Sequence, residues 1–162
     1  MHLLAVAATL LFPLAPGTHW TLRDVHSGAK TTISVAKDRV LHGLPGAGNV
    51  HVRSVGKTVQ ARDAGHWEDW FRFDAKAGTR YKVALGSTIL WRDVDVRVVS
   101  KTASAREYHG KKHHGCTRFA FQVGGVADAG VTGMTFCPRV GPVRFSETTI
   151  GGPRTFALVS SG

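Results

Sequence analysis

The chain has few acidic residues and no long apolar segment after its first fourteen residues. Its 11 aspartates and glutamates stand against 21 lysines and arginines, which gives a formal net charge of +10 at pH 7 over 162 residues. A membrane-spanning helix needs about 20 apolar residues, so the later sequence excludes one and predicts a soluble mature protein. The shortage of negative charge favours polyanionic partners, such as nucleic acid, anionic lipid or an acidic cell-wall polymer.

The sequence also lacks the motifs of the common catalytic sites. Neither the Gly-x-Ser-x-Gly of a nucleophile elbow nor the Gly-x4-Gly-Lys-Ser/Thr of a phosphate loop occurs. No heptads, fixed-period repeat or helical pattern is present. An enzymatic activity is therefore not predicted, although nine histidines leave acid–base chemistry open.

Apolar and polar side chains alternate along residues 69–73, 79–85 and 93–99. A period of two is expected of strands with one buried and one wet face. Glycines divide the remaining sequence into intervals rich in β-branched and aromatic residues, a pattern typical of all-β sandwiches and barrels. The predicted strands are residues 21–26, 31–36, 49–55, 58–61, 67–74, 79–85, 93–99, 118–123, 131–136, 142–146 and 155–160. Parity predicts that the core is formed by Phe71, Phe73, Tyr81, Val83, Leu85, Val94, Val96, Val98, Phe119, Phe121, Val123, Phe156 and Leu158.

Residues 3–14 are apolar apart from Thr9 and Pro13. This stretch has the length of a signal-peptide core, and the small residues Ala15 and Gly17 suit a signal peptidase. The sequence predicts a signal peptide over residues 1–17 and a secreted, extracellular domain over residues 18–162. The basic residues that usually precede such a core are missing, and a buried N-terminal strand is the alternative.

The only cysteines are Cys116 and Cys137. An even number of cysteines in an exported protein indicates a disulfide, whereas a protein that is not exported would hold two buried thiols. Closing a loop of about 20 residues stabilises the native state by roughly 3 kcal/mol on the chain-entropy model.

Four segments together resemble the pre-peptidase C-terminal (PPC-type) domain. They are Asp-Trp-Phe-Arg-Phe at 69–73, Ala-Gly-Thr at 77–79, Asp-Val-Asp-Val at 93–96, and the closing segment 152–159. Such domains are appended to secreted bacterial proteases and other exported hydrolases. The resemblance implies an antiparallel, jelly-roll-like β-sandwich with its PPC-like part over residues 64–162, and a role in binding or folding assistance. No catalytic domain accompanies the module in this chain.

Trp70 is predicted to point outward, opposite Phe71 and Phe73, where an indole can stack on a sugar ring. The leading hypothesis is a secreted, non-catalytic binding module for an extracellular polysaccharide or anionic surface, with nucleic acid disfavoured. The alternative for the basic residues, which are scattered along the predicted strands, is that they form a solvated surface and no binding site. The predicted ligand-binding residues are Trp70, Arg72, Arg92 and Arg97.

Asp93 and Asp95 lie on one face by parity, and Asp69 from a neighbouring strand is the third predicted calcium ligand. The resemblance adds support, because related sandwich domains that bind collagen use calcium. The favoured interpretation is that these carboxylates form cross-strand salt bridges. The arginines considered for those salt bridges are Arg72, Arg92 and Arg97.

His109, His113, His114 and Cys116 form a cluster with the side chains that zinc prefers. A disulfide would consume Cys116, and the adjacent lysines oppose a cation, so a solvated basic loop is the favoured interpretation. Two further hypotheses remain open. One is a small basic toxin or hydrolase that uses the His109–His114 loop, and the other is a partner or inhibitor of a secreted protease.

Overall fold

The computed structural model describes residues 11–124 and 130–162, which form strands and turns without a helix. All strand pairs are antiparallel, as predicted. No helix within these two ranges has the length and apolar character needed to cross a membrane. The strands are β1 (His19–Asp24), β2 (Lys30–Val35), β3 (Val40–His42), β4 (Val50–Val55), β5 (Thr58–Asp63), β6 (His66–Arg72), β7 (Arg80–Val83), β8 (Val94–Arg106), β9 (Lys112–Val123), β10 (Gly130–Cys137), β11 (Gly141–Thr149) and β12 (Gly152–Ser161).

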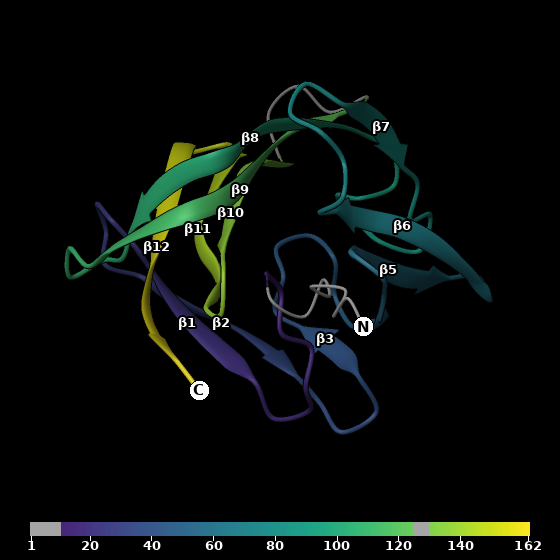
Figure 1. The fold of residues 1–162 in the computed structure, drawn as a ribbon, viewed down its shortest axis with the longest axis horizontal. Helices are drawn as coiled ribbons and strands as arrows, with labels where there is room; N and C mark the ends of the chain where they lie inside the picture. Colours follow the sequence, from purple (N-terminus) through teal and green to yellow (C-terminus); the bar gives the residue numbers. More distant parts are fainter. Residues whose placement is uncertain (1–10, 125–129) are drawn as a thin grey trace, which may run out of the picture.

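The twelve strands form one sheet that curls into a nearly closed barrel (Figure 1). Neighbours in the sheet are neighbours in the chain, except that β12 returns to pair with β1 and that β6 and β7 are the two edges. The prediction of a jelly-roll-like sandwich is therefore wrong, although the all-β antiparallel class is confirmed. A sandwich needs connections that pass between two layers, whereas this chain is a meander that bends around a single interior.

Aromatic rings fill the interior of the barrel. The Phe71 ring lies 5.0 Å from that of Phe136 and 5.8 Å from that of Phe119, measured between centroids. These rings come from β6, β9 and β10, so they join strands from the two sides of the seam between β6 and β7. The predicted core residues are buried except for Tyr81 and Val123, which are half-buried.

The interior also contains a side chain from the segment that precedes β1. Phe12 is fully buried, and its ring centroid lies 5.0 Å from that of Phe136. The Gly17 N–H donates a 2.8 Å hydrogen bond to the Val35 carbonyl, which holds the segment against β2. The first ten residues of the predicted signal peptide lie outside the described residues, and cleavage after Gly17 stays a prediction. The folded barrel includes Phe12, which that cleavage would remove.

The predicted disulfide is confirmed. Cys116 on β9 and Cys137 on β10 are bonded with an S–S distance of 2.06 Å. The bond joins neighbouring strands at the point where β9 extends beyond its pairing with β10, which begins at Thr117.

Side chains close the seam between the edge strands β6 and β7. The Tyr81 hydroxyl of β7 accepts a hydrogen bond from the Arg72 N–H at 3.1 Å and donates one to the Trp70 carbonyl at 3.0 Å. Burial raises the pKa of Tyr81, so its hydroxyl stays protonated and able to donate. Asp63 accepts hydrogen bonds from the Gly86 and Ser87 N–H groups across the same seam.

We expect Tyr81→Phe to lower the free energy of unfolding by about 1–3 kcal/mol, because it leaves the Arg72 N–H and the Trp70 carbonyl without their shared partner. Urea unfolding followed by fluorescence measures the change. Tyr108→Phe is the matched control, since it removes a hydroxyl for which the described residues show no hydrogen bond. Equal losses in both variants would show that the seam does not depend on the Tyr81 hydroxyl.

Candidate functional site

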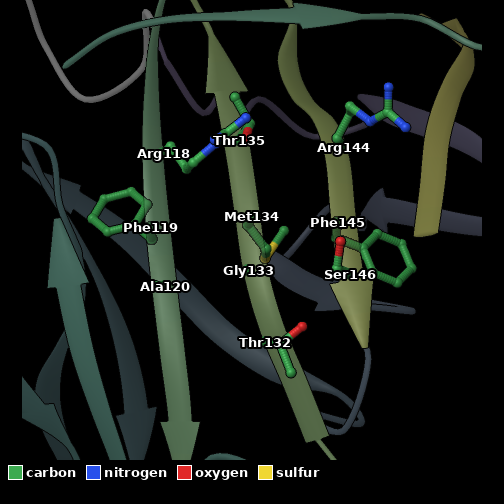
Figure 2. A pocket seen from close by; sticks show the side chains of 10 residues that line it. All are labelled: Arg118, Phe119, Ala120, Thr132, Gly133, Met134, Thr135, Arg144, Phe145 and Ser146. Carbon is green, nitrogen blue, oxygen red and sulfur yellow. The ribbon is translucent and has the colours of Figure 1, made fainter. Parts of the chain in front are cut away.

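The outer face of β9, β10 and β11 carries a row in which one threonine lies between two arginines. Thr135 on β10 is in register with Arg118 on β9 and with Arg144 on β11. Figure 2 shows these side chains on three adjacent strands. Their chain neighbours Phe119 and Phe145 are buried in the core, so alternation places the arginines on the opposite, outer face.

A second row lies two residues further along the same strands. Gly133 on β10 is in register with Ala120 on β9 and Ser146 on β11. These small residues leave a hollow of about 370 Å³ on the sheet, next to Arg118 and Arg144 (Figure 2). Two residues of strand span about 7 Å, which is the approximate separation of the two rows.

A neighbouring hollow of about 250 Å³ shares Arg118 and Arg144 and adds Arg106 and Lys112 from the β8–β9 hairpin. No carboxylate lines either hollow. The ion pairs of the described residues are formed by Lys82, His113 and Arg154, and none includes a cation that lines these two hollows. We call the two adjoining hollows the basic groove; its cationic residues are Arg106, Lys112, Arg118 and Arg144.

The tip of the β8–β9 hairpin is fixed against β12 and β1. The Tyr108 N–H donates a 2.8 Å hydrogen bond to the Leu158 carbonyl, and the Arg23 guanidinium lies 5.1 Å from the Tyr108 ring centroid. Further along β9, the disulfide between Cys116 and Cys137 ties the hairpin to β10. These anchors keep Arg106 and Lys112 beside the arginines of the sheet.

The predicted histidine cluster is divided among separate contacts. His113 Nε2 lies 2.7 Å from Glu107 Oε1, and His114 Nδ1 lies 3.0 Å from Ser104 Oγ. Cys116 is in the disulfide, so it offers no thiolate. No group of three histidine, cysteine, aspartate or glutamate side chains is placed to hold a metal ion within residues 11–124 and 130–162.

The predicted calcium ligands also have protein partners. Lys82 Nζ lies 3.6 Å from Asp93 Oδ1 and 3.4 Å from Asp95 Oδ1, whereas Asp69 accepts a 2.8 Å hydrogen bond from Gln60. The hydrogen bond with Asp95, together with the charges of both aspartates, raises the pKa of Lys82. Cross-strand salt bridges are present as the favoured interpretation predicted, but the cation is Lys82 rather than an arginine.

The prediction that Trp70 points outward is wrong. Val59 pairs with Phe71 and Gln60 with Asp69, so Trp70 is the extra residue of a β-bulge. The bulge breaks the alternation, and the Trp70 indole is fully buried with its centroid 5.2 Å from that of Trp91. A buried indole cannot form a stacking platform for a ligand at the surface.

The three predicted ligand-binding arginines do not share one site. The Arg72 guanidinium lies over the Tyr81 ring at the seam, 5.5 Å from its centroid, and Arg92 is exposed between β7 and β8. Arg97 on β8 is in register with Ala120, so it is adjacent to the basic groove. Arg118 and Arg144 were not among the predicted ligand-binding residues.

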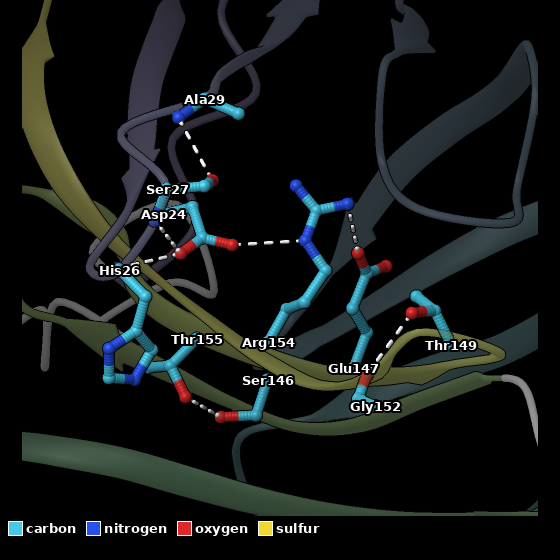
Figure 3. A network of polar contacts seen from close by, with 10 residues as sticks. All are labelled: Asp24, His26, Ser27, Ala29, Ser146, Glu147, Thr149, Gly152, Arg154 and Thr155. Atoms are coloured by element: carbon cyan, nitrogen blue, oxygen red, sulfur yellow. Dashed lines mark hydrogen bonds and ion pairs between the residues drawn. The ribbon is translucent and has the colours of Figure 1, made fainter.

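A second polar cluster links the β1–β2 turn to β12 (Figure 3). Buried Asp24 accepts hydrogen bonds from the His26 and Ser27 N–H groups at 2.8 and 3.0 Å, and from Arg154 Nε at 3.0 Å. These bonds lower the pKa of Asp24 to about 2. Arg154 Nη1 also lies 3.6 Å from Glu147 Oε1, so this arginine pairs with two carboxylates.

No family model and no curated protein matches the chain. Membership of the PPC-type family therefore stays a prediction. A crystal structure from Bacteroides fragilis, described as a "putative exported protein with YmcC-like fold", matches with a TM-score of 0.50 at 9% identity, covering 94% of this chain and 99% of that one. A "putative lipoprotein" from Parabacteroides distasonis gives a TM-score of 0.45 at 12% identity, covering 94% and 98%. The first likeness shows the fold alone, and export of this chain remains a prediction.

Proposed function

We propose that the protein is a secreted, non-catalytic module that binds an acidic polysaccharide through the basic groove. The observation that carries this proposal is the convergence of Arg106, Lys112, Arg118 and Arg144 on adjoining hollows without a carboxylate. Clustered cations attract a polyanion over distance and bind its anionic groups with charge-assisted hydrogen bonds.

The lining of the groove favours a polysaccharide over a nucleic acid. Single-stranded nucleic acids are bound mainly by stacking of bases on aromatic side chains. The aromatic residues that line the groove, Phe119 and Phe145, are buried in the core. The hydroxyls of Thr132 and Ser146 line it instead, and they suit the hydroxyl groups of a sugar.

The double variant Arg118→Gln/Arg144→Gln is expected to bind polygalacturonate roughly tenfold more weakly, because two charge-assisted contacts are lost. Its affinity should also depend less on salt concentration. Affinity electrophoresis at two salt concentrations, with neutral dextran as the reference polymer, measures both changes.

Lys57→Gln/Lys76→Gln is the matched control, because it removes the same charge at two exposed positions outside the groove. It should stay close to the unmodified protein. Equal weakening in the two double variants would mean that net charge, and not the groove, determines binding.

A further inference from the structure

We infer that the groove recognises a uronic acid unit, with the sugar ring in the hollow beside Gly133 and the carboxylate between Arg118 and Arg144. This inference rests on the proposed function and specifies the chemistry of its ligand. It follows from the division of the groove into a neutral part and a cationic part that lie side by side.

The neutral part has the chemistry that a sugar ring requires. Its floor consists of Ala120 and Gly133, which place no bulky side chain on the sheet, and Thr132 and Ser146 add hydroxyl groups. The hollow as a whole, which Arg118, Thr135 and Arg144 also line, has a volume of about 370 Å³, within the range typical of small-molecule sites, roughly 300–1,000 Å³. A polyhydroxylated ring can exchange hydrogen bonds with these hydroxyls without needing a charge.

The cationic part can hold one anionic group between its two arginines once Arg144 turns toward Arg118, because Figure 2 shows the Arg144 side chain extending away from it. Arg118 and Arg144 flank Thr135 on adjacent strands, so their Cα atoms lie about 10 Å apart. Arginine side chains are long enough to converge across that distance, and each guanidinium presents a planar fork that matches a carboxylate. Because the arginine row is about 7 Å from the Gly133 row, one bound unit can reach both parts.

Use of the hollow would distinguish a uronic acid oligomer from other polyanions. A linear polyphosphate has no ring, so it would use the cations and leave the hollow empty. A uronic acid oligomer would use both. Dependence of binding on the shape at Gly133 is therefore the property to test.

Gly133→Val fills the hollow without changing the charge. The Gly133 backbone is not in the left-handed region, and an added Cβ would meet only the Phe119 carbonyl oxygen, at 3.3 Å. A β-branched residue suits a strand, so a small shift should accommodate it. Ala120→Leu fills the same hollow from β9, and Gly151→Val is the control, in the exposed β11–β12 turn. Thermal melting and near-ultraviolet circular dichroism establish that each variant is folded.

Calorimetric titration with trigalacturonate and with polyphosphate tests the inference. We expect Gly133→Val and Ala120→Leu to weaken trigalacturonate binding at least tenfold and to leave polyphosphate binding within twofold, with Gly151→Val unchanged. Arg118→Gln/Arg144→Gln should weaken both ligands.

Unchanged trigalacturonate binding in the folded hollow-filling variants would overturn the inference, as would a single-stranded oligonucleotide that binds more tightly than trigalacturonate. If the arginine variant still loses affinity for both anions, the proposed function stands without the ring site. If that variant binds both anions normally, the proposed function itself fails.

Discussion

Phe71→Ala is expected to lower the free energy of unfolding by about 3–5 kcal/mol, the usual cost of truncating a fully buried phenylalanine. Phe71 is fully buried, and its ring packs against those of Phe73, Trp91, Phe119 and Phe136. These rings come from different parts of the barrel wall. The cavity left by the substitution cannot collapse without moving several strands, so little of the loss is recovered.

Urea unfolding gives the change from the shift in midpoint at constant slope. Ile89→Ala is the control, since Ile89 is 82% exposed and its truncation should cost less than about 0.5 kcal/mol. A loss below about 1 kcal/mol for Phe71→Ala would mean that the interior is not packed around this ring.

Alternation in the sequence located most strands because one face of each is buried. Eleven of the twelve strands overlap a predicted one, and the exception is β3 (Val40–His42), whose three residues are too few to show a period. The β8 strand continues to Arg106, well beyond the predicted 93–99. Register shifts after Val98 disturb the alternation there, which hides the continuation.

The closure of the sheet could not be predicted from the same pattern. A strand in a sandwich and a strand in a barrel both bury one face, so their local sequences look alike. Closure depends on the pairing of β12 with β1 and on the Tyr81 hydroxyl at the seam. The β12–β1 pairing joins residues that are far apart in the chain, and the Tyr81 hydroxyl joins the two edge strands. Local alternation carries information about neither contact.

The candidate site was only partly accessible from the sequence. Parity places Arg118 opposite Phe119 and Arg144 opposite Phe145, so their outward orientation could have been predicted. Their position on either side of Thr135 depends on strand register, which alternation does not give. Trp70 shows the opposite failure, because one bulge residue turned a predicted surface side chain into the core.

Asp24→Asn tests the cluster that joins the β1–β2 turn to β12. The Asp24 carboxylate is buried and accepts hydrogen bonds from two backbone N–H groups and from Arg154. The pKa of Asp24 falls from 3.8 to about 2, and this shift corresponds to about 2 kcal/mol of stabilisation at neutral pH. The asparagine amide keeps the shape but loses the charge, so the variant should be less stable than the unmodified protein by about that amount at pH 7.

The pH dependence distinguishes loss of the charge from a change in packing. Because the folded-state pKa lies below the unfolded-state value, the stabilisation is complete above about pH 4 and is lost as the pH falls toward 2. The free energies of unfolding of Asp24→Asn and the unmodified protein should therefore differ at pH 7 and converge near pH 2. Asp38→Asn, at an exposed position, should follow the unmodified protein throughout. A difference that persists unchanged at pH 2 would show that the substitution acts through packing, since Asp24 has by then lost most of its extra stabilisation.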